Sequence, residues 1–167
     1  MFKKFFNKSI ESAKSQKAQI FVPITGKVVP IEEVPDPIFS EKMMGEGAAV
    51  IPSEGKVVAP VNGEIIQVAP TKHAIGILSE DGSEILIHIG LETVALDGEG
   101  FTVHVNVGDK ISVGQALMDF DLEVIKTKAS NIISPIVITN SKDTNRTYKQ
   151  TDATEGKAGE TAIFHVS

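Results

Sequence analysis

The sequence predicts an all-β protein, an antiparallel β-sandwich or barrel-sandwich with internal duplication and a few short helical turns. From residue 20 onward, short Val/Ile-rich runs alternate with turn residues, a spacing typical of antiparallel sheets. Residues 22–29 (VPITGKVV) and 59–66 (APVNGEII) share the placement of proline, glycine and apolar residues, 37 positions apart. The period does not continue, which indicates a duplicated β fold rather than a solenoid. Aromatic residues make up only 5% of the chain, so the core must be built from Val, Ile, Leu and Ala.

The N-terminal residues form a separate piece. Residues 1–10 (MFKKFFNKSI) place three phenylalanines and an isoleucine on one helical face, flanked by lysines. A basic amphipathic stub of this kind could rest on an anionic membrane surface as a peripheral contact, and the alternative is a frayed terminus. Residues 11–19 are polar and read as a linker. We therefore divide the chain into a tail and linker, 1–19, and one domain, 20–167.

Composition excludes several classes of protein. With 167 residues, the chain is long enough for one domain with a real core. A net charge of −6 with a single arginine argues against nucleic-acid binding. The absence of cysteine excludes a disulfide scaffold and a thiolate zinc site, and it fits a cytoplasmic location. No apolar run approaches the ~18 residues that span a bilayer. We expect a monomer.

Two histidines fall on a predicted β-hairpin made of residues 71–78 and 85–90. A two-residue turn at Asp81-Gly82 would place Ile75 opposite His88 and His73 opposite Gly90. The two histidines would then be diagonal neighbours on one face, roughly 5–8 Å apart at Cβ. Two imidazoles side by side on a rigid sheet indicate a functional site.

The faces of this hairpin differ in composition. Ile85, Ile87 and Ile89 form a branched row suited to a core, so the histidine face should be the outer one. On that outer face we expect an apolar collar around the histidines that includes Leu86, with Ile75 and Ile77 across from it. Thr71 lies two residues before His73, and its hydroxyl could orient that imidazole. The carbonyl of Gly90 is our candidate to hold one ring nitrogen of His88.

Helical structure is expected at two places only. Residues 122–128 read as a short helix that Asp121 could cap, and residues 38–44 could hold another turn. The two other histidines, His104 and His165, lie in alternating strands with no polar partner nearby in sequence. We interpret both as structural.

Several segments, in order along the chain, resemble the glucose-type EIIA domain of the bacterial phosphoenolpyruvate-dependent sugar phosphotransferase system. The signature resemblance lies in residues 87–94 (IHIGLETV), followed by GEGF at 98–101. The other matching blocks are residues 34–47, 58–63, 71–74, 107–122 and 134–140. The signature region thus runs from about 34 to 140, and the resemblance covers nearly everything from about residue 20 onward.

The resemblance implies an all-β sandwich of the duplicated hybrid motif type and a phosphoryl-transfer function. His88 would accept a phosphoryl group from the phosphocarrier HPr and pass it to a cysteine of a sugar-specific EIIB domain. His73 would be the second active-site histidine and Thr71 its hydroxyl partner. No cofactor is required, although His73 and His88 could bind zinc opportunistically, completed by a partner's carboxylate.

The resemblance also implies an apolar surface on which HPr and EIIB dock. The residues that would line this surface or its rim are Asp36, Ile38, Phe39, Met43, Met44, Leu86, Glu92 and Val94. Met43-Met44 stands where smaller branched residues are frequent, and Glu92 where aspartate is frequent. Regulated transporters or kinases could use the same surface.

Three other functions were weighed. A zinc peptidase on a related fold would need a third ligand, and Asp97, Glu92 and His104 lack the H-E-x-x-H spacing. A lipoyl- or biotinyl-like carrier is suggested by residues 107–110 and 41–44, whose lysine would have to lie at an exposed hairpin tip. A regulatory module that docks partners without transferring anything stays open.

Overall fold

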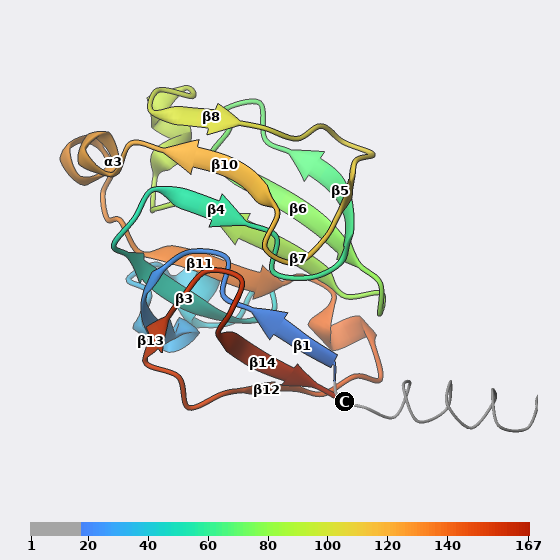
Figure 1. Ribbon diagram of the computed structural model, residues 1–167. Helices are drawn as coiled ribbons and strands as arrows, with labels where there is room; N and C mark the ends of the chain where they lie inside the picture. The colour runs from blue at the N-terminus through green and yellow to red at the C-terminus, as the bar shows by residue number, and fades with distance from the viewer. Residues whose placement is uncertain (1–17) are drawn as a thin grey trace, which may run out of the picture.

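The computed structural model describes residues 18–167 and confirms the predicted all-β class (Figure 1). The expected basic amphipathic stub and most of the linker, residues 1–17, lie outside the described residues. Within residues 18–167, no helix has the length and apolar character needed to cross a bilayer.

The strands form one large and two small sheets, all antiparallel. The eight-stranded sheet has the order β13-β2-β3-β11-β7-β6-β5-β9. Its strands are β2 (Gly26–Pro30), β3 (Glu46–Pro52), β5 (Gly63–Val68), β6 (Ala74–Ser79), β7 (Glu84–His88), β9 (Lys110–Ile111), β11 (Ser134–Ile138) and β13 (Glu155–Gly156). The small sheets are β4-β10-β8 and β1-β14-β12. Their strands are β1 (Ala18–Phe21), β4 (Lys56–Val58), β8 (Phe101–Val103), β10 (Ala116–Phe120), β12 (Tyr148–Gln150) and β14 (Ala162–Val166).

Helical segments are few and short. Within residues 18–167, the α-helical segments are α2 (Pro37–Ser40) and α3 (Leu122–Lys128). The 3-10 turns are Ile31–Glu33, Thr93–Leu96 and Ser141–Asp143. The helix predicted at 122–128 is confirmed with its cap, because the Asp121 carboxylate accepts hydrogen bonds from the Glu123 and Val124 amides. The second predicted turn appears as α2, whose cap is Asp36.

The predicted duplication is visible in the hydrogen bonds between the repeats. The Phe21 amide donates to the Pro60 carbonyl, and the Val58 amide donates to the Pro23 carbonyl, both at 2.9 Å. The two bonds are equivalent: Phe21 and Val58 are counterparts 37 positions apart, and so are Pro23 and Pro60. In the large sheet, β2 and β5, which continue the two repeats, are each the second strand from an edge, and β11 and β7 lie side by side at the centre. In Figure 1 one small sheet lies in the upper half and the other in the lower half.

The main core lies between the large sheet and the two small ones. It is aliphatic, as composition predicts, and includes Ile85, Ile87 and Ile89, all at most 1% exposed. A second, smaller core lies where residues 31–39 cover the outer face of β2, β3 and β11, and it includes Phe39 and Val137. That cover ends beside β7. The outer face of β7 therefore lies at the border between a covered and an open half of the sheet.

The predicted pairing of the histidine hairpin is wrong by one residue. Ala74, rather than Ile75, lies opposite His88. The turn holds three residues rather than two, because the Ser79 amide donates to the Ser83 carbonyl and the Gly82 amide to the Ser79 carbonyl. Gly82 has φ +91°, the left-handed conformation that completes a three-residue hairpin loop.

This shift reverses the expected orientation of two side chains on β6. Ile75 and Ile77 lie opposite Ile87 and Ile85 and point into the core, fully buried, instead of flanking the histidines. The outer face of β6 carries Ala74 and Gly76 instead.

Candidate functional site

The site begins with the ring of His88 at the end of β7. Its Nδ1 lies 2.8 Å from the carbonyl oxygen of Gly90, as the sequence predicts. Because a carbonyl only accepts hydrogen bonds, Nδ1 carries the proton of the neutral ring. The other nitrogen, Nε2, therefore holds the lone pair. The hydrogen bond to Gly90 therefore leaves Nε2 as the ring nitrogen that can act as a nucleophile.

His73 reaches the same place by a route that strand pairing alone would not allow. Continued strand geometry would point this side chain toward the core, yet β6 begins only at Ala74. A turn precedes it: the Lys72 amide donates to the Ala69 carbonyl, and Lys72 has φ +64°. The ring of His73 consequently lies with its centroid 4.8 Å from that of His88, edge to face.

Thr71 is placed by the same turn. Its Oγ1 lies 2.7 Å from Nδ1 of His73, which bears out the expected hydroxyl contact. His73 is only 9% exposed, whereas His88 is half-buried. The expectation that both histidines lie at the surface is therefore corrected: His88 is the more accessible ring, and His73 lies deeper beside it.

Burial shifts the titration of both histidines in the same direction. Desolvation lowers the pKa of His73. Desolvation also lowers the pKa of His88, and repulsion from His73 lowers it further, while the Gly90 carbonyl and the Asp36 carboxylate oppose the shift. Both rings are consequently neutral near pH 7, the form in which a ring nitrogen can attack.

Gly90 owes its position to residues that sequence reasoning missed. It has φ +68°, and a Cβ there would lie 2.8 Å from Thr93 Cγ2. Its amide donates to the buried Ser134 Oγ at 3.1 Å, and Ser134 in turn donates to the Ile132 carbonyl. Ser134 is 44 residues away in sequence. No local pattern could have revealed this support.

The docking residues expected from sequence surround the pair in two hollows that share Met44, His73 and His88. The first hollow, about 300 Å³, is also lined by Asp36, Ile38, Phe39, Glu92 and Val94. The second, about 380 Å³, extends over the open half of the sheet past Leu86. This hollow has further lining residues that the sequence did not predict: Ile66, Gln67, Ala69 and Gly76.

Two of these residues differ from the expected picture. Phe39 is 4% exposed and tilts against the His88 ring, with centroids 5.4 Å apart, so it supports the ring more than it offers docking area. Met43 is 66% exposed but lines neither hollow. Ile38 and Val94 are exposed apolar side chains, at 42% and 57%.

Metal and remote histidines were also examined by geometry. Among residues 18–167, no group of three or more His, Asp or Glu side chains is arranged to hold a metal ion. His104 has a polar partner that is distant in sequence, because its Nε2 lies 2.7 Å from Oδ2 of Asp119, 15 residues away. Asp119 lies on β10 and His104 directly follows β8, so this exposed pair lies apart from His73 and His88.

Comparison with known proteins agrees with this geometry. The family model of the phosphoenolpyruvate-dependent sugar phosphotransferase system, EIIA 1, matches residues 18–144. A glucose-specific EIIA component from Halalkalibacterium halodurans is 54% identical over 170 aligned positions, covering 99% of this chain and 98% of the relative. One from Staphylococcus epidermidis is 50% identical, covering 100% and 99%.

A solved structure shares the fold. Glucose permease IIA from Mycoplasma capricolum superposes with a TM-score of 0.83 at 36% identity, covering 91% of this chain and 96% of that one. The family model, the relatives and the fold agree, and the chain belongs to the EIIA 1 family of the phosphoenolpyruvate-dependent sugar phosphotransferase system.

Proposed function

We propose that Nε2 of His88 is the atom that carries the phosphoryl group. As a member of its family, the protein is a phosphocarrier that works between HPr and the EIIB component of a sugar transporter. The hydrogen bond from His88 Nδ1 to the Gly90 carbonyl is the observation that carries the assignment, because it leaves Nε2 unprotonated. The Nε2 lone pair forms the new N–P bond while the N–P bond of phospho-HPr breaks. The electron pair of that bond returns to the donor ring.

His73 is proposed to stabilise the transferred group. When the Thr71 hydroxyl donates to Nδ1 of His73, the ring proton lies on Nε2 and can be donated to a phosphoryl oxygen. Phosphoryl transfer passes through a loose, in-line transition state, so positioning and charge stabilisation are what the protein contributes. One neutral donor provides modest stabilisation. A carrier gains from this, since it must release the group to the next acceptor.

The two hollows support the proposed docking surface. Their exposed apolar side chains, Ile38 and Val94, can pack against HPr or EIIB and exclude water from the N–P bond. In the onward step, the EIIB cysteine sulfur attacks phosphorus and the bond to His88 breaks. The glucose-specific relatives favour glucose as the sugar served. A cytoplasmic location follows from a function between HPr and EIIB. Zinc binding by the two histidines, and docking of transporters or kinases, stay predictions.

The assignment is tested by incubating the protein with phosphoenolpyruvate, Enzyme I and HPr and mapping acid-labile phosphate. We expect His88→Ala to abolish incorporation. His73→Gln should still be phosphorylated, but its transfer to EIIB should slow by about a hundred-fold, the usual cost of losing one hydrogen-bond donor to the reacting group. His104→Gln is the matched control, because His104 is exposed and directly follows β8, which belongs to another sheet. Equal loss of the first step in the His88 and His73 variants would contradict this division of roles.

A further inference from the structure

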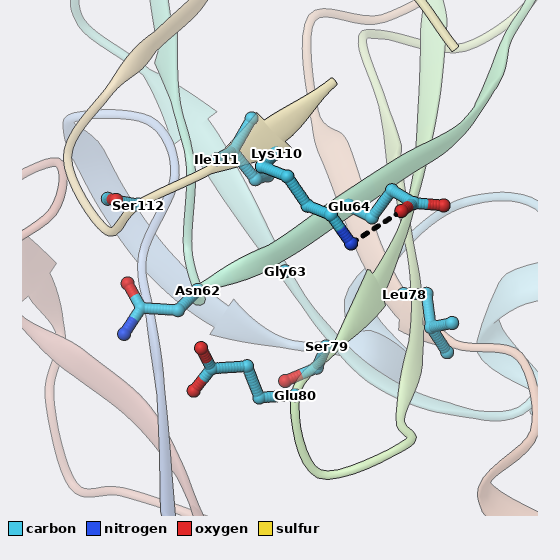
Figure 2. A pocket seen from close by; sticks show the side chains of 9 residues that line it. All are labelled: Asn62, Gly63, Glu64, Leu78, Ser79, Glu80, Lys110, Ile111 and Ser112. Atoms are coloured by element: carbon cyan, nitrogen blue, oxygen red, sulfur yellow. Dashed lines mark ion pairs between the residues drawn. The ribbon is translucent and has the colours of Figure 1, made fainter. Parts of the chain in front are cut away.

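We propose that the basic N-terminal segment, residues 1–17, docks on its own chain in a groove beside the start of β1. We call it the hairpin-turn groove. It consists of two adjoining hollows, about 490 and 310 Å³, that share Asn62, Ser79 and Glu80. Figure 2 shows the first hollow, with the side chains of Asn62 and Glu80 on its edge. This proposal goes beyond phosphoryl transfer and does not depend on it.

The groove combines an apolar floor with carboxylates. Its second hollow is lined by Phe21, Val61 and Val113, and by the carboxylates of Glu80 and Asp81 at the hairpin turn. Asp81 is already engaged, because its Oδ1 accepts a hydrogen bond from the Ser83 amide. Glu80 is exposed and forms no ion pair with any residue in the described range 18–167.

The lysine that lines the groove does not compensate Glu80. Lys110 lies in the first hollow, and its Nζ is 2.8 Å from Glu64 Oε1 (Figure 2). The charges of Lys110 and Glu64 therefore compensate each other. Within residues 18–167, the groove therefore offers the carboxylate of Glu80 without an ion pair and next to apolar surface, which matches a ligand that is both cationic and apolar.

The N-terminal segment has that chemistry. It holds five lysines and one glutamate, a net charge of +4. The whole chain carries −6, so residues 18–167 carry −10. The charge complementarity between segment and domain is thus strong. The segment also holds Phe2, Phe5 and Phe6, whose burial against apolar surface is favourable.

Because the N-terminal segment is covalently attached next to the groove, a weak contact is sufficient for docking. Ala18, where the described chain begins, itself lines the groove. The twelve residues from Phe6 to Ala18 can extend to about 40 Å, more than enough to fold back onto an adjoining hollow. A short flexible tether supplies an effective concentration of about a millimolar. Intramolecular docking therefore needs only modest affinity.

Docking here leaves the histidine site open. The groove lies at the turn end of the β6–β7 hairpin, whereas His88 lies at the other end of β7, five residues from Ser83. Five strand residues span about 17 Å. A variant that releases the segment should accordingly leave phosphorylation by HPr unchanged, which separates this proposal from the one above.

The test uses the full-length chain, which contains no cysteine. Asn7→Cys is labelled with a nitroxide, and amide broadening is measured by NMR in dilute protein. We expect strong broadening at Asn62, Glu80 and Val113. Glu80→Lys should lower the docked-to-free ratio by about five-fold, as expected when an attractive charge pair becomes repulsive. Glu54→Lys is the matched control, since Glu54 is exposed, has the same charge change and lines neither hollow.

The result has two opposing outcomes. Broadening at the groove that Glu80→Lys reduces and Glu54→Lys preserves supports the proposal. Groove broadening that is equal in the two variants, or the absence of broadening at Glu80 and Val113, overturns it. The proposal is also wrong if groove contacts are absent in buffer and the labelled segment becomes ordered only on adding phosphatidylglycerol vesicles, since the segment would then be a membrane anchor alone.

Discussion

The imidazole of His88 is held on three sides. The Gly90 carbonyl binds Nδ1, the His73 ring lies edge to face against it, and the Phe39 ring tilts against it. Together these contacts limit rotation of the ring and keep Nε2 directed toward the two hollows. A preoriented nucleophile lowers the entropic cost of reaching an in-line geometry with the incoming phosphorus.

The protonation of His88 leads to a prediction about pH. Because burial lowers its pKa below the usual value near 6.5, the neutral, attacking form should persist to below that pH. The midpoint can be read from the ring proton shifts of His88 by NMR. Asp36→Asn should lower the midpoint further, because it removes a carboxylate that raises the pKa of His88. Asparagine still caps α2, so the local fold is retained.

Glu92→Gln provides the comparison for this titration. Glu92 lines the same hollow and loses the same charge, but it is not among the groups that shift His88. We expect its midpoint to match that of the unaltered protein. A midpoint above 6.5, or equal shifts in the two variants, would show that desolvation and Asp36 do not act as described.

At the scale of elements, the β6–β7 hairpin is tied to the rest of the molecule at its turn. The Ser83 hydroxyl, fully buried, lies 2.6 Å from the Tyr148 hydroxyl on β12. Arg146 Nε donates to the same Tyr148 oxygen at 3.0 Å. This network joins the large sheet to the β1-β14-β12 sheet. It fixes the hairpin that carries His88 at its far end.

Tyr148→Phe should therefore destabilise the fold by about 1–2 kcal/mol, because it leaves the buried Ser83 hydroxyl without its partner. The measurement is urea unfolding followed by circular dichroism, since the chain has no tryptophan. The double variant with Ser83→Ala should lose less than the sum of the two single losses. Additive losses would mean that the two hydroxyls do not interact.

Local elements were predictable to the extent that their signals were local. The helix at 122–128 was predicted because its cap, Asp121, is adjacent in sequence. The turn of the hairpin was not, since Asp81-Gly82 fits both a two-residue and a three-residue loop. The bond from Ser79 to Ser83 decides between them. That one residue of difference placed Ile75 and Ile77 in the core.

The whole molecule is organised around the centre of the eight-stranded sheet. There β7 pairs with β11, and Ile87 lies opposite Ile136, each at most 1% exposed. The inner face of this central pair belongs to the main core, and the outer face carries the site. Neighbouring residues on β7 therefore have different roles: Ile87 packs in the core, and Leu86 lines the site.

Ile87→Ala and Leu86→Ala should separate these roles. Truncating Ile87 opens a cavity in the core and should cost about 2–5 kcal/mol. Truncating the half-buried Leu86 should cost about 1 kcal/mol. It should also raise the KM for phospho-HPr, because Leu86 lines the second hollow. Urea midpoints and phosphorylation kinetics measure the two effects. Equal losses of stability would indicate that both faces of β7 are packed alike.

Alternation of apolar residues, turn punctuation and the repeat at 22–29 and 59–66 determined by themselves an aliphatic, duplicated β protein. They also pointed to the two histidines with Thr71 and Gly90. These signals are readable because side-chain direction in a strand repeats every two residues.

Only the tertiary structure decided how His73 meets His88. The strand register by itself would have separated them, and the turn at Lys72 brings His73 back. It also decided that Ser134 supports Gly90 and that the Ser79–Ser83 bond defines the register. These contacts join residues far apart in sequence or depend on a choice between turns of similar energy. The packed sheets make that choice, because only one register buries the isoleucines of both β6 and β7.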